Sequence, residues 1–186
     1  MDKKILFFDI EASGLKTSVG ILIAIGVYDP LTQAEPEVKI ITKPEEEPEL
    51  LRWFERKIKE GEYDTICGWN SKKYDLPFIL GRALQLGLDF SWLMNLNHID
   101  LIEVSRKNFL FHSNSMEEVC ELLRIKYNPP IPARLVGFNF MKSLTGNAEA
   151  ARKIVERCKQ DVKALSELYE KFEPYLLNDS VTHNQK

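Results

Sequence analysis

The 186-residue sequence lacks the marks of several protein classes. No apolar run approaches the roughly 20 residues that span a bilayer. The N-terminal residues also lack the pattern of a secretory signal peptide, which is an apolar segment followed by a small-residue cleavage site. We therefore expect no membrane association and a cytoplasmic location. The three cysteines, Cys67, Cys120 and Cys158, are widely spaced and form no C-x-x-C pair. This spacing argues against a disulfide framework and a zinc site, and predicts buried thiols in a reducing compartment.

An excess of positive charge is also missing. Lys and Arg number 25 against 28 Asp and Glu, which gives a formal net charge of -3. Any binding of nucleic acid must therefore rest on a local basic patch or on bound metal ions. Nine glycines and nine prolines are too few for a fibrous or disordered chain, and 44% hydrophobic residues is typical of a globular one. We expect one domain over 1–177 and a polar, mobile tail at 178–186.

The sequence does contain a strand that ends in two acids. The run Ile-Leu-Phe-Phe-Asp-Ile-Glu over 5–11 is typical of a buried strand. Side chains two apart in a strand share a face, so Asp9 and Glu11 point the same way and Ile10 points the other way. One interpretation is a strand that runs out into solvent, with both acids hydrated. The other is a site for Mg²⁺ or Mn²⁺, because hard cations bind carboxylate oxygens and unpaired buried carboxylates are unfavourable.

The remaining pattern predicts an α/β fold with a mixed sheet covered by helices. Apolar, β-branched runs and helical spacing of apolar residues predict the other elements. The strands are expected at 19–28, 37–42, 65–69 and 98–101, and the helices at 45–61, 75–86, 115–123 and 147–175, the last in two pieces. The first three strands form an antiparallel meander. We interpret the acidic run 45–47 as helix capping and solvation, and the proline-rich segment 128–132 as an extended loop.

Two further segments bring polar side chains toward the same edge of the sheet. A polar loop at 70–74 follows the strand 65–69, and Asp75 begins the next helix. Asp75 has the position of a helix cap, a use that is compatible with metal binding. On the late helix, Arg157 and Asp161 lie four residues apart and share a face, so Asp161 is a candidate fourth carboxylate.

These segments resemble the motifs of the DEDD superfamily of 3′–5′ exonucleases. The likeness is greatest to the proofreading domain of family B DNA polymerases and its stand-alone relatives, and covers roughly 4–175. It is carried by Phe8-Asp9-Ile10-Glu11 with Ser13-Gly14-Leu15, by Asn70 and Tyr74-Asp75-Leu76-Pro77-Phe78, by His98-Ile99-Asp100-Leu101 and by Asn114-Ser115-Met116-Glu117-Glu118-Val119. The resemblance implies a ribonuclease H-like fold, with a mixed five-stranded sheet of an antiparallel meander and parallel strands, flanked by helices.

The resemblance also implies a chemistry. Asp9, Glu11, Asp75 and Asp161 become the catalytic acids that hold two Mg²⁺ or Mn²⁺ ions. Such a pair of ions stabilises both the attacking and the leaving oxygen of a phosphodiester. The implied activity is that of a DNA-repair type 3′–5′ exonuclease that degrades single-stranded DNA ends and releases nucleoside 5′-monophosphates. Self-association or a replication or repair partner would supply processivity.

Substrate contacts are implied as well. The residues assigned to them are Ser13, Gly14, Leu15, Asn70, Lys72, Lys73 and Tyr74. The turn 13–15 matches one that contacts the terminal nucleotide through its backbone and an apolar wedge, although a turn with a core leucine has the same residues. The loop 70–74 is basic and carries an aromatic, which suits single-stranded nucleic acid, and plain surface lysines are the alternative.

One position departs from the family's pattern. The family places Tyr four residues before its last Asp, or His five before it, whereas this sequence has Arg157 and Glu156 there. Arg stays protonated and cannot act as a general base, whose loss slows a reaction by about 10² to 10⁴. Either the metal ions suffice, or Arg157 binds the scissile phosphate, or the site is weak or inactive. The first alternative function is therefore a catalytically weakened nucleic-acid-binding module, and a separate alternative is an enzyme of the same chemistry that trims RNA 3′ ends.

Overall fold

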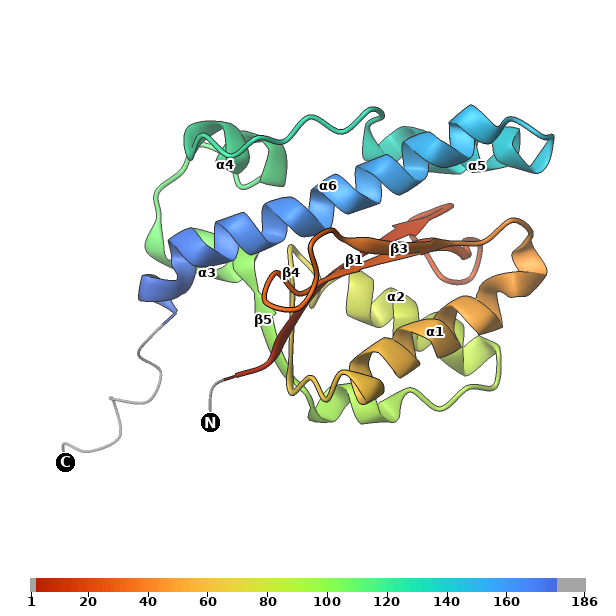
Figure 1. The fold of residues 1–186 in the computed structure, drawn as a ribbon, viewed down its shortest axis with the longest axis horizontal. Helices are drawn as coiled ribbons and strands as arrows, with labels where there is room; N and C mark the ends of the chain where they lie inside the picture. The colour runs from red at the N-terminus through yellow and green to blue at the C-terminus, as the bar shows by residue number, and fades with distance from the viewer. Residues whose placement is uncertain (1–2, 177–186) are drawn as a thin grey trace.

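The computed structural model describes residues 3–176, so the tail expected at 178–186 lies outside the described part (Figure 1). This part is built on a five-stranded sheet with the order β3-β2-β1-β4-β5. Its strands are β1 (Ile5–Ala12), β2 (Leu22–Tyr28), β3 (Glu37–Ile40), β4 (Thr65–Gly68) and β5 (Asn97–Asp100). β1, β2 and β3 pair antiparallel, and β4 pairs parallel with both β1 and β5. The predicted meander and mixed sheet are confirmed.

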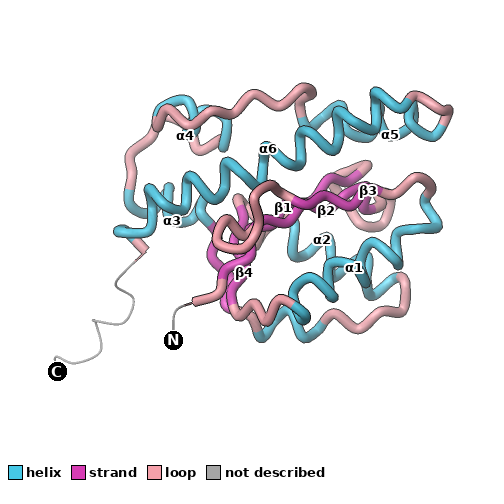
Figure 2. The backbone as a smooth tube through the Cα atoms, viewed as in Figure 1, coloured by secondary structure: helices cyan, strands magenta, loops and turns pink. Residues whose placement is uncertain are grey.

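Helices cover both faces of the sheet (Figures 1 and 2). On one face lie α1 (Glu47–Glu60) and α2 (Asp75–Gln85). On the other lie α3 (Leu101–Asn108), α4 (Met116–Leu122), α5 (Val136–Leu144) and α6 (Ala148–Phe172). Short 3₁₀ turns occupy Pro44–Glu46, Ser91–Asn95, Ala133–Leu135 and Glu173–Tyr175. α6 packs along β1, β2 and β3, and therefore covers the centre of the sheet.

β1 is buried because its side chains alternate between two cores. Phe8 packs in the core that α1 and α2 share with the sheet, whereas Phe7 packs in the core beneath α6. Residues two apart share a face of a strand, so Asp9 and Glu11 continue the α6 face. The two acids thus project toward a helix rather than into open solvent.

A glycine in β2 lets α6 approach the sheet at this point. Gly26 is the register partner of Asp9, and a Cβ at Gly26 would lie 2.7 Å from Cys158 Sγ of α6. Cys158 Sγ is itself 3.9 Å from the Asp9 carbonyl oxygen. The missing side chain at Gly26 therefore brings the middle of α6 down onto the end of β1.

Several predicted boundaries are corrected. The strand expected from 19 begins only at Leu22, because 13–19 form bends and turns, and the third strand ends at Ile40 rather than 42. The strand expected at 98–101 is 97–100, because Leu101 already begins α3. The helix expected at 147–175 is one uninterrupted α-helix over 148–172, which contains no Gly or Pro, followed by the 3₁₀ turn at 173–175. α3 and α5 were not predicted.

The state of the cysteines and the character of the helices can be compared with what the sequence predicts. Cys67, Cys120 and Cys158 are buried and form no disulfide, as predicted. Among the described residues, no helix has both the length and the apolar character needed to cross a bilayer.

Candidate active site

Three carboxylates from two elements meet beneath α6. Asp9 and Glu11 project from β1 and Asp161 from α6, and one oxygen of each lies within 4.8 Å of the others. Glu11 and Asp161 are buried, and Asp9 is partly buried. The arrangement offers three hard oxygen ligands to one divalent cation.

Asp75 lies beside this cluster. It is the first residue of α2, and the cap position belongs to Tyr74, so the expected cap role of Asp75 is wrong by one residue. Its Oδ1 instead accepts the N–H of Ile10 at 3.1 Å, which ties the start of α2 to β1. Asp75 lines the same cleft as Asp9 and Glu11, and its charge raises the pKa of both. The structure therefore brings the fourth acid to the cluster's edge.

Burial is the largest cause of the raised pKa of each of these four acids, and repulsion from neighbouring acids adds to it for Asp9, Glu11 and Asp75. Burial raises the pKa of Glu11 to about 8 and that of Asp75 to about 7. The pKa of Asp9 is raised well above its ordinary value by burial and then by the charge of Asp161. Burial also raises the pKa of Asp161, against opposing effects of Arg157 and Tyr127. The fold thus holds these carboxylates together against an electrostatic penalty that a divalent cation at the cluster would relieve.

Arg157 supplies one positive charge to the cluster. Its Nε lies 2.9 Å from Glu11 Oε1, and its Nη2 lies 3.2 Å from Asp161 Oδ2. Nη1 donates to the carbonyl oxygen of Ile131 at 3.1 Å. Burial acts to lower the pKa of Arg157, but the charges of Asp161 and then Glu11 outweigh it and raise the pKa. The guanidinium is therefore charged at any working pH.

The ion pairs of Arg157 are not aligned hydrogen bonds. Glu11 Oε1, Asp161 Oδ2 and Arg157 Nε are buried, yet none of the three atoms makes a hydrogen bond of acceptable geometry. Buried polar atoms usually find such partners. The two carboxylate oxygens are therefore incompletely satisfied by the protein, which fits a set of ligands for a metal ion.

Tyr127 is a site residue that sequence reasoning missed. Its hydroxyl donates to Asp161 Oδ1 at 2.5 Å. Tyr127 lies near the start of the loop that connects α4 to α5, and this loop runs beside α6 (Figure 1). The Asn128 N–H in the loop donates a hydrogen bond to Gln160 Oε1 of α6 at 3.0 Å. The predicted extended loop at 128–132 is correct. A tyrosine hydroxyl therefore does reach Asp161, but from this loop rather than from position 157 of the helix.

Asp100 holds the loop that carries Asn70. Its Oδ1 accepts the Asn70 N–H at 2.7 Å, and its Oδ2 accepts the Lys72 N–H at 3.0 Å. Asn70 has φ +59°, a left-handed conformation that residues with a side chain adopt rarely. Asp100 also accepts the Ile102 N–H at 3.3 Å as the cap of α3. One carboxylate at the end of β5 thus fixes the segment leading into Asp75.

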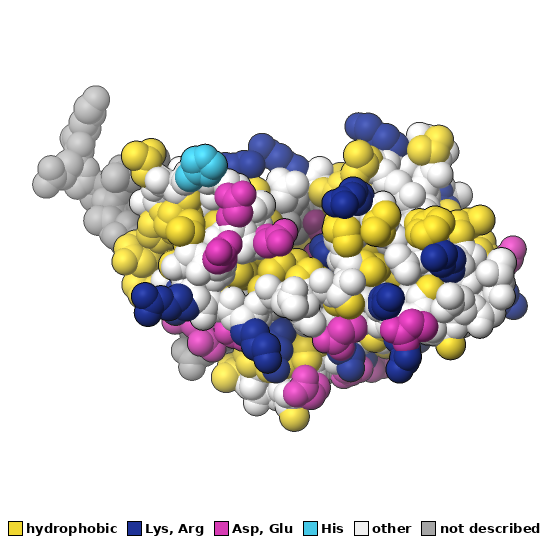
Figure 3. Space-filling view, turned by 90° about the horizontal axis from the view of Figure 1, so that it is seen from above, with side chains coloured by type: hydrophobic (Ala, Val, Ile, Leu, Met, Phe, Trp, Pro, Cys, Tyr) yellow, Lys and Arg dark blue, Asp and Glu magenta, His cyan; other side chains and the backbone are white. Residues whose placement is uncertain are grey.

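A cleft of about 740 Å³ opens beside the acids and is lined by Asp9, Glu11, Asp75 and Arg157 together with the turn 13–15 and α5. Three large apolar side chains of its lining are exposed: Leu15 (80%), Phe138 (57%) and Met141 (63%). Arg134 lines it too. Figure 3 shows the face that carries α5, where apolar side chains lie among Lys and Arg. The exposure of Leu15 rules out the core-leucine alternative.

The expected substrate contacts divide into two groups. Those that line the cleft are Ser13, Gly14, Leu15, Asn70 and Tyr74. The Tyr74 hydroxyl donates to the Gly14 carbonyl oxygen at 3.0 Å and joins the two segments. The lysines do not belong to the lining described for the cleft. Lys72 Nζ pairs with Glu103 Oε2 at 2.7 Å, and Lys73 is exposed.

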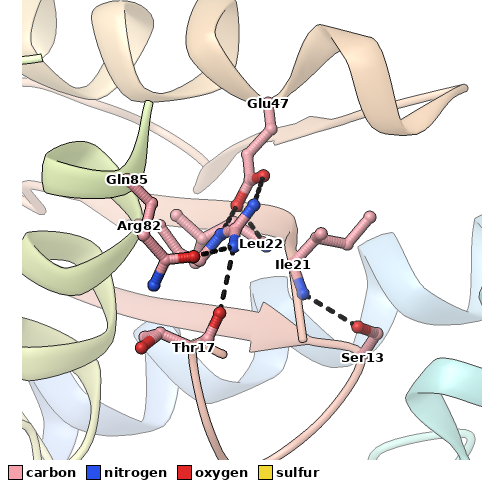
Figure 4. A network of polar contacts seen from close by, with 7 residues as sticks. All are labelled: Ser13, Thr17, Ile21, Leu22, Glu47, Arg82 and Gln85. Atoms are coloured by element: carbon pink, nitrogen blue, oxygen red, sulfur yellow. Dashed lines mark hydrogen bonds and ion pairs between the residues drawn. The ribbon is translucent and has the colours of Figure 1, made fainter. Parts of the chain in front are cut away.

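A buried ion pair anchors the turn at 13–19 (Figure 4). Glu47, only 1% exposed, receives Arg82 Nε at 2.8 Å and Nη2 at 2.6 Å, and also accepts the Leu22 N–H at 2.8 Å. Arg82 Nη1 donates to the Thr17 carbonyl oxygen at 3.0 Å. The interpretation of the acidic run as capping and solvation is therefore wrong for Glu47, which is buried and links α1, α2 and β2.

Comparisons with known proteins agree with this fold. The family model described as the RNase_H superfamily matches residues 6–173. The chain therefore belongs to the RNase H superfamily. It is 24% identical to a DNA polymerase of Thermococcus litoralis and 22% identical to one of Thermococcus aggregans, each over 205 residues. These matches cover 92% of this chain but only 12% and 11% of the two polymerases.

A solved structure is also similar. The family B DNA polymerase from the hyperthermophilic archaeon Pyrobaculum calidifontis matches with a TM-score of 0.77 and 19% identity. The match covers 92% of this chain and 25% of that chain. The predicted ribonuclease H-like fold and the relation to DEDD exonucleases are thus confirmed. This membership indicates a nuclease-type hydrolase, and nucleases of this superfamily generally use divalent metal ions.

Proposed function

We propose that this protein is a metal-dependent 3′–5′ exonuclease that hydrolyses single-stranded DNA ends and releases nucleoside 5′-monophosphates. The observation that carries the proposal is the meeting of Asp9, Glu11 and Asp161 within 4.8 Å, with Asp75 on the same cleft. When bound, two Mg²⁺ or Mn²⁺ ions lower the pKa of the attacking water and stabilise the attacking and leaving oxygens.

The chain's own residues orient this chemistry. The four acids are the ion ligands, and the Tyr127 hydroxyl fixes the rotamer of Asp161 through its hydrogen bond. The Ile10 N–H fixes Asp75 in the same way. Arg157 accepts no proton, so the chain offers no general base at that position. The activation of water would therefore depend on the ions that the four acids would hold, and loss of the general base alone supports a slow enzyme rather than an inactive one.

The walls of the cleft support a single-stranded substrate. Phe138 and Met141 expose apolar surface on which bases can stack, and Arg134 offers a cation for a phosphate. Stacking and phosphate contacts carry little sequence information, so the enzyme acts without sequence preference. A cleft of about 740 Å³ has the volume of a small-ligand site, which suits terminal nucleotides better than a duplex.

The proposal is tested with one oligonucleotide labelled at either end. In Mg²⁺ or Mn²⁺, the 3′ label should leave first as a mononucleotide, while the 5′-labelled strand shortens stepwise, and EDTA should stop both. Internal cuts as the first products would contradict an exonuclease. Binding without cleavage would favour the weakened binding module, and faster loss from the RNA version would favour an RNA-trimming enzyme.

Phe138→Ala should weaken substrate binding. Stacking on an aromatic contributes about 1–3 kcal/mol per base, so KM for single-stranded DNA should rise roughly tenfold while kcat changes little. Steady-state kinetics on an oligonucleotide measures both. Leu31→Ala serves as the control, because Leu31 is also apolar and even more exposed (91%, against 57% for Phe138) but lies in the β2–β3 turn outside the cleft lining. An unchanged KM in Phe138→Ala would mean that Phe138 of α5 does not contact the substrate.

Tyr127→Phe should weaken the metal centre without unfolding the protein. It deletes one hydroxyl that holds Asp161 Oδ1 and keeps the ring. Loss of a hydrogen bond to a metal ligand typically lowers metal affinity or activity about 10- to 100-fold. Mn²⁺ titration and single-turnover rates measure the two effects. Tyr175→Phe, at an exposed tyrosine outside the cleft lining, should leave both unchanged.

A further inference from the structure

Arg157 and a metal ion would use the same oxygens. The guanidinium contacts Glu11 at 2.9 Å and Asp161 at 3.2 Å, and these are two of the three carboxylates that converge within 4.8 Å. The side chain is only 13% exposed, so water does little to screen its charge from the cluster. A neutral side chain at 157 would leave the oxygens to the ion alone.

We propose that Arg157 is an internal counter-ion that competes with divalent cations for Glu11 and Asp161, so that tight metal binding requires its guanidinium to withdraw. The inference rests on the proposed function in so far as it takes these acids as metal ligands. It assigns to Arg157 a regulation of metal occupancy rather than a step of the chemistry.

The contacts of Arg157 permit such a withdrawal. Its two ion pairs lack hydrogen-bond geometry, and therefore lack the directional part that makes an aligned Arg–carboxylate pair strong. Its Nη1 bond to the Ile131 carbonyl oxygen is independent of the carboxylates. In the metal-free protein, the single guanidinium relieves part of the repulsion among Asp9, Glu11 and Asp161.

A substrate in the cleft would offer the guanidinium an alternative anionic partner. Arg157 lines the cleft next to Glu11, so a substrate phosphate there offers it an alternative anion. A strand that draws Arg157 away from the carboxylates frees them for the ion. Metal and single-stranded DNA should therefore bind with positive coupling, each tightening the other by the same factor.

The test is a calorimetric titration of the metal-free protein with Mn²⁺. Arg157→Gln should bind Mn²⁺ at least about tenfold more tightly, because a unit charge about 5 Å from a dication already has an effect of that order at the dielectric of water. Arg157→Lys keeps the charge and should show a smaller gain. Arg152→Gln is the matched control, because it removes the same charge from the same helix at an exposed ion pair with Glu149.

Thermal unfolding separates competition from a structural role. In EDTA, Arg157→Gln should unfold at a lower temperature than the wild type, and saturating Mn²⁺ should raise its unfolding temperature more than that of the wild type. A merely structural arginine would lower both temperatures equally. Equal Mn²⁺ affinity in the wild type and Arg157→Gln would overturn the inference about Arg157 but leave the proposed function standing. Absence of Mn²⁺ binding in both would overturn the proposed function as well.

Discussion

Asp9→Asn should lower the rate of hydrolysis by about 10³-fold or more and, in the absence of metal, should stabilise the protein. Asp9 contributes one of the three converging oxygens, and a bound ion stabilises the transition state by several kcal/mol, where each 1.36 kcal/mol is tenfold in rate. The pKa of Asp9 is raised by burial and by Asp161, Asp75 and Glu11, so a neutral amide removes repulsion. Few substitutions outside such a site inactivate and stabilise together.

The stabilisation should depend on pH in a defined direction. Acids whose pKa is raised by folding stabilise the folded state fully at low pH, and lose that contribution as pH rises through the folded pKa. For Asp9 the window begins at its ordinary value of 3.8 and extends upward to its raised folded pKa. In EDTA, the gain in unfolding temperature from Asp9→Asn should therefore grow across this window.

The control for this prediction is an acid outside the cluster. Asp89 is an acid whose pKa is lowered by hydrogen bonds from Ser91, so Asp89→Asn should keep the rate and lose a little stability. A near-wild-type rate in Asp9→Asn would refute the metal centre. A lower unfolding temperature in EDTA would mean that Asp9 is held by favourable contacts rather than by repulsion.

Local periodicity was enough to predict part of the site. The two-residue alternation of β1 places Asp9 and Glu11 on one face, and the helical spacing of α6 places Arg157 and Asp161 together. Both statements concern neighbours within one element. The meeting of the two elements depended on the motif resemblance, because sequence spacing contains no distance between Asp9 and Asp161.

The residues that were missed act between elements. Tyr127 lies in a loop without periodicity, and Asp100 reaches Asn70 only because β4 and β5 pair in parallel, with Gly68 opposite Asp100. Contacts of this kind follow from the tertiary arrangement of the chain. The only sequence signal for Tyr127 was its position before the proline-rich segment 128–132, and that position does not predict a contact with Asp161.

α5 was missed for a different reason. Its sequence, VGFNFMKSL, has apolar side chains on more than one face and a glycine at its second position, which weakens both the helical pattern and the helical propensity. A Cβ at Gly137 would lie 3.1 Å from the Ser13 carbonyl oxygen. The glycine thus allows α5 to pack closely against the turn 13–15, and the exposed Phe138 and Met141 that face the cleft region obscure the pattern.

Glu47→Ala should destabilise the protein by about 3–5 kcal/mol, the usual result of removing one partner of a buried ion pair. The substitution leaves Arg82, which is largely buried, without its carboxylate, and leaves the Leu22 N–H without its acceptor. Urea unfolding measures the loss. Because Arg82 also holds the Thr17 carbonyl oxygen, the turn that leads into the cleft should loosen, and KM for single-stranded DNA should rise with it.

Glu49→Ala is the matched control on the same helix. Glu49 pairs with Arg56 at 2.8 Å and with Lys39 at 3.3 Å, but these pairs are exposed to solvent, and such surface pairs contribute little to stability. The two variants remove the same charge from the same first turn of α1. Equal losses of stability in both would contradict the buried role of Glu47. A large loss of stability in Glu47→Ala but not in Glu49→Ala would show that the buried ion pair, rather than the negative charge at the start of the helix, accounts for the contribution of Glu47 to stability.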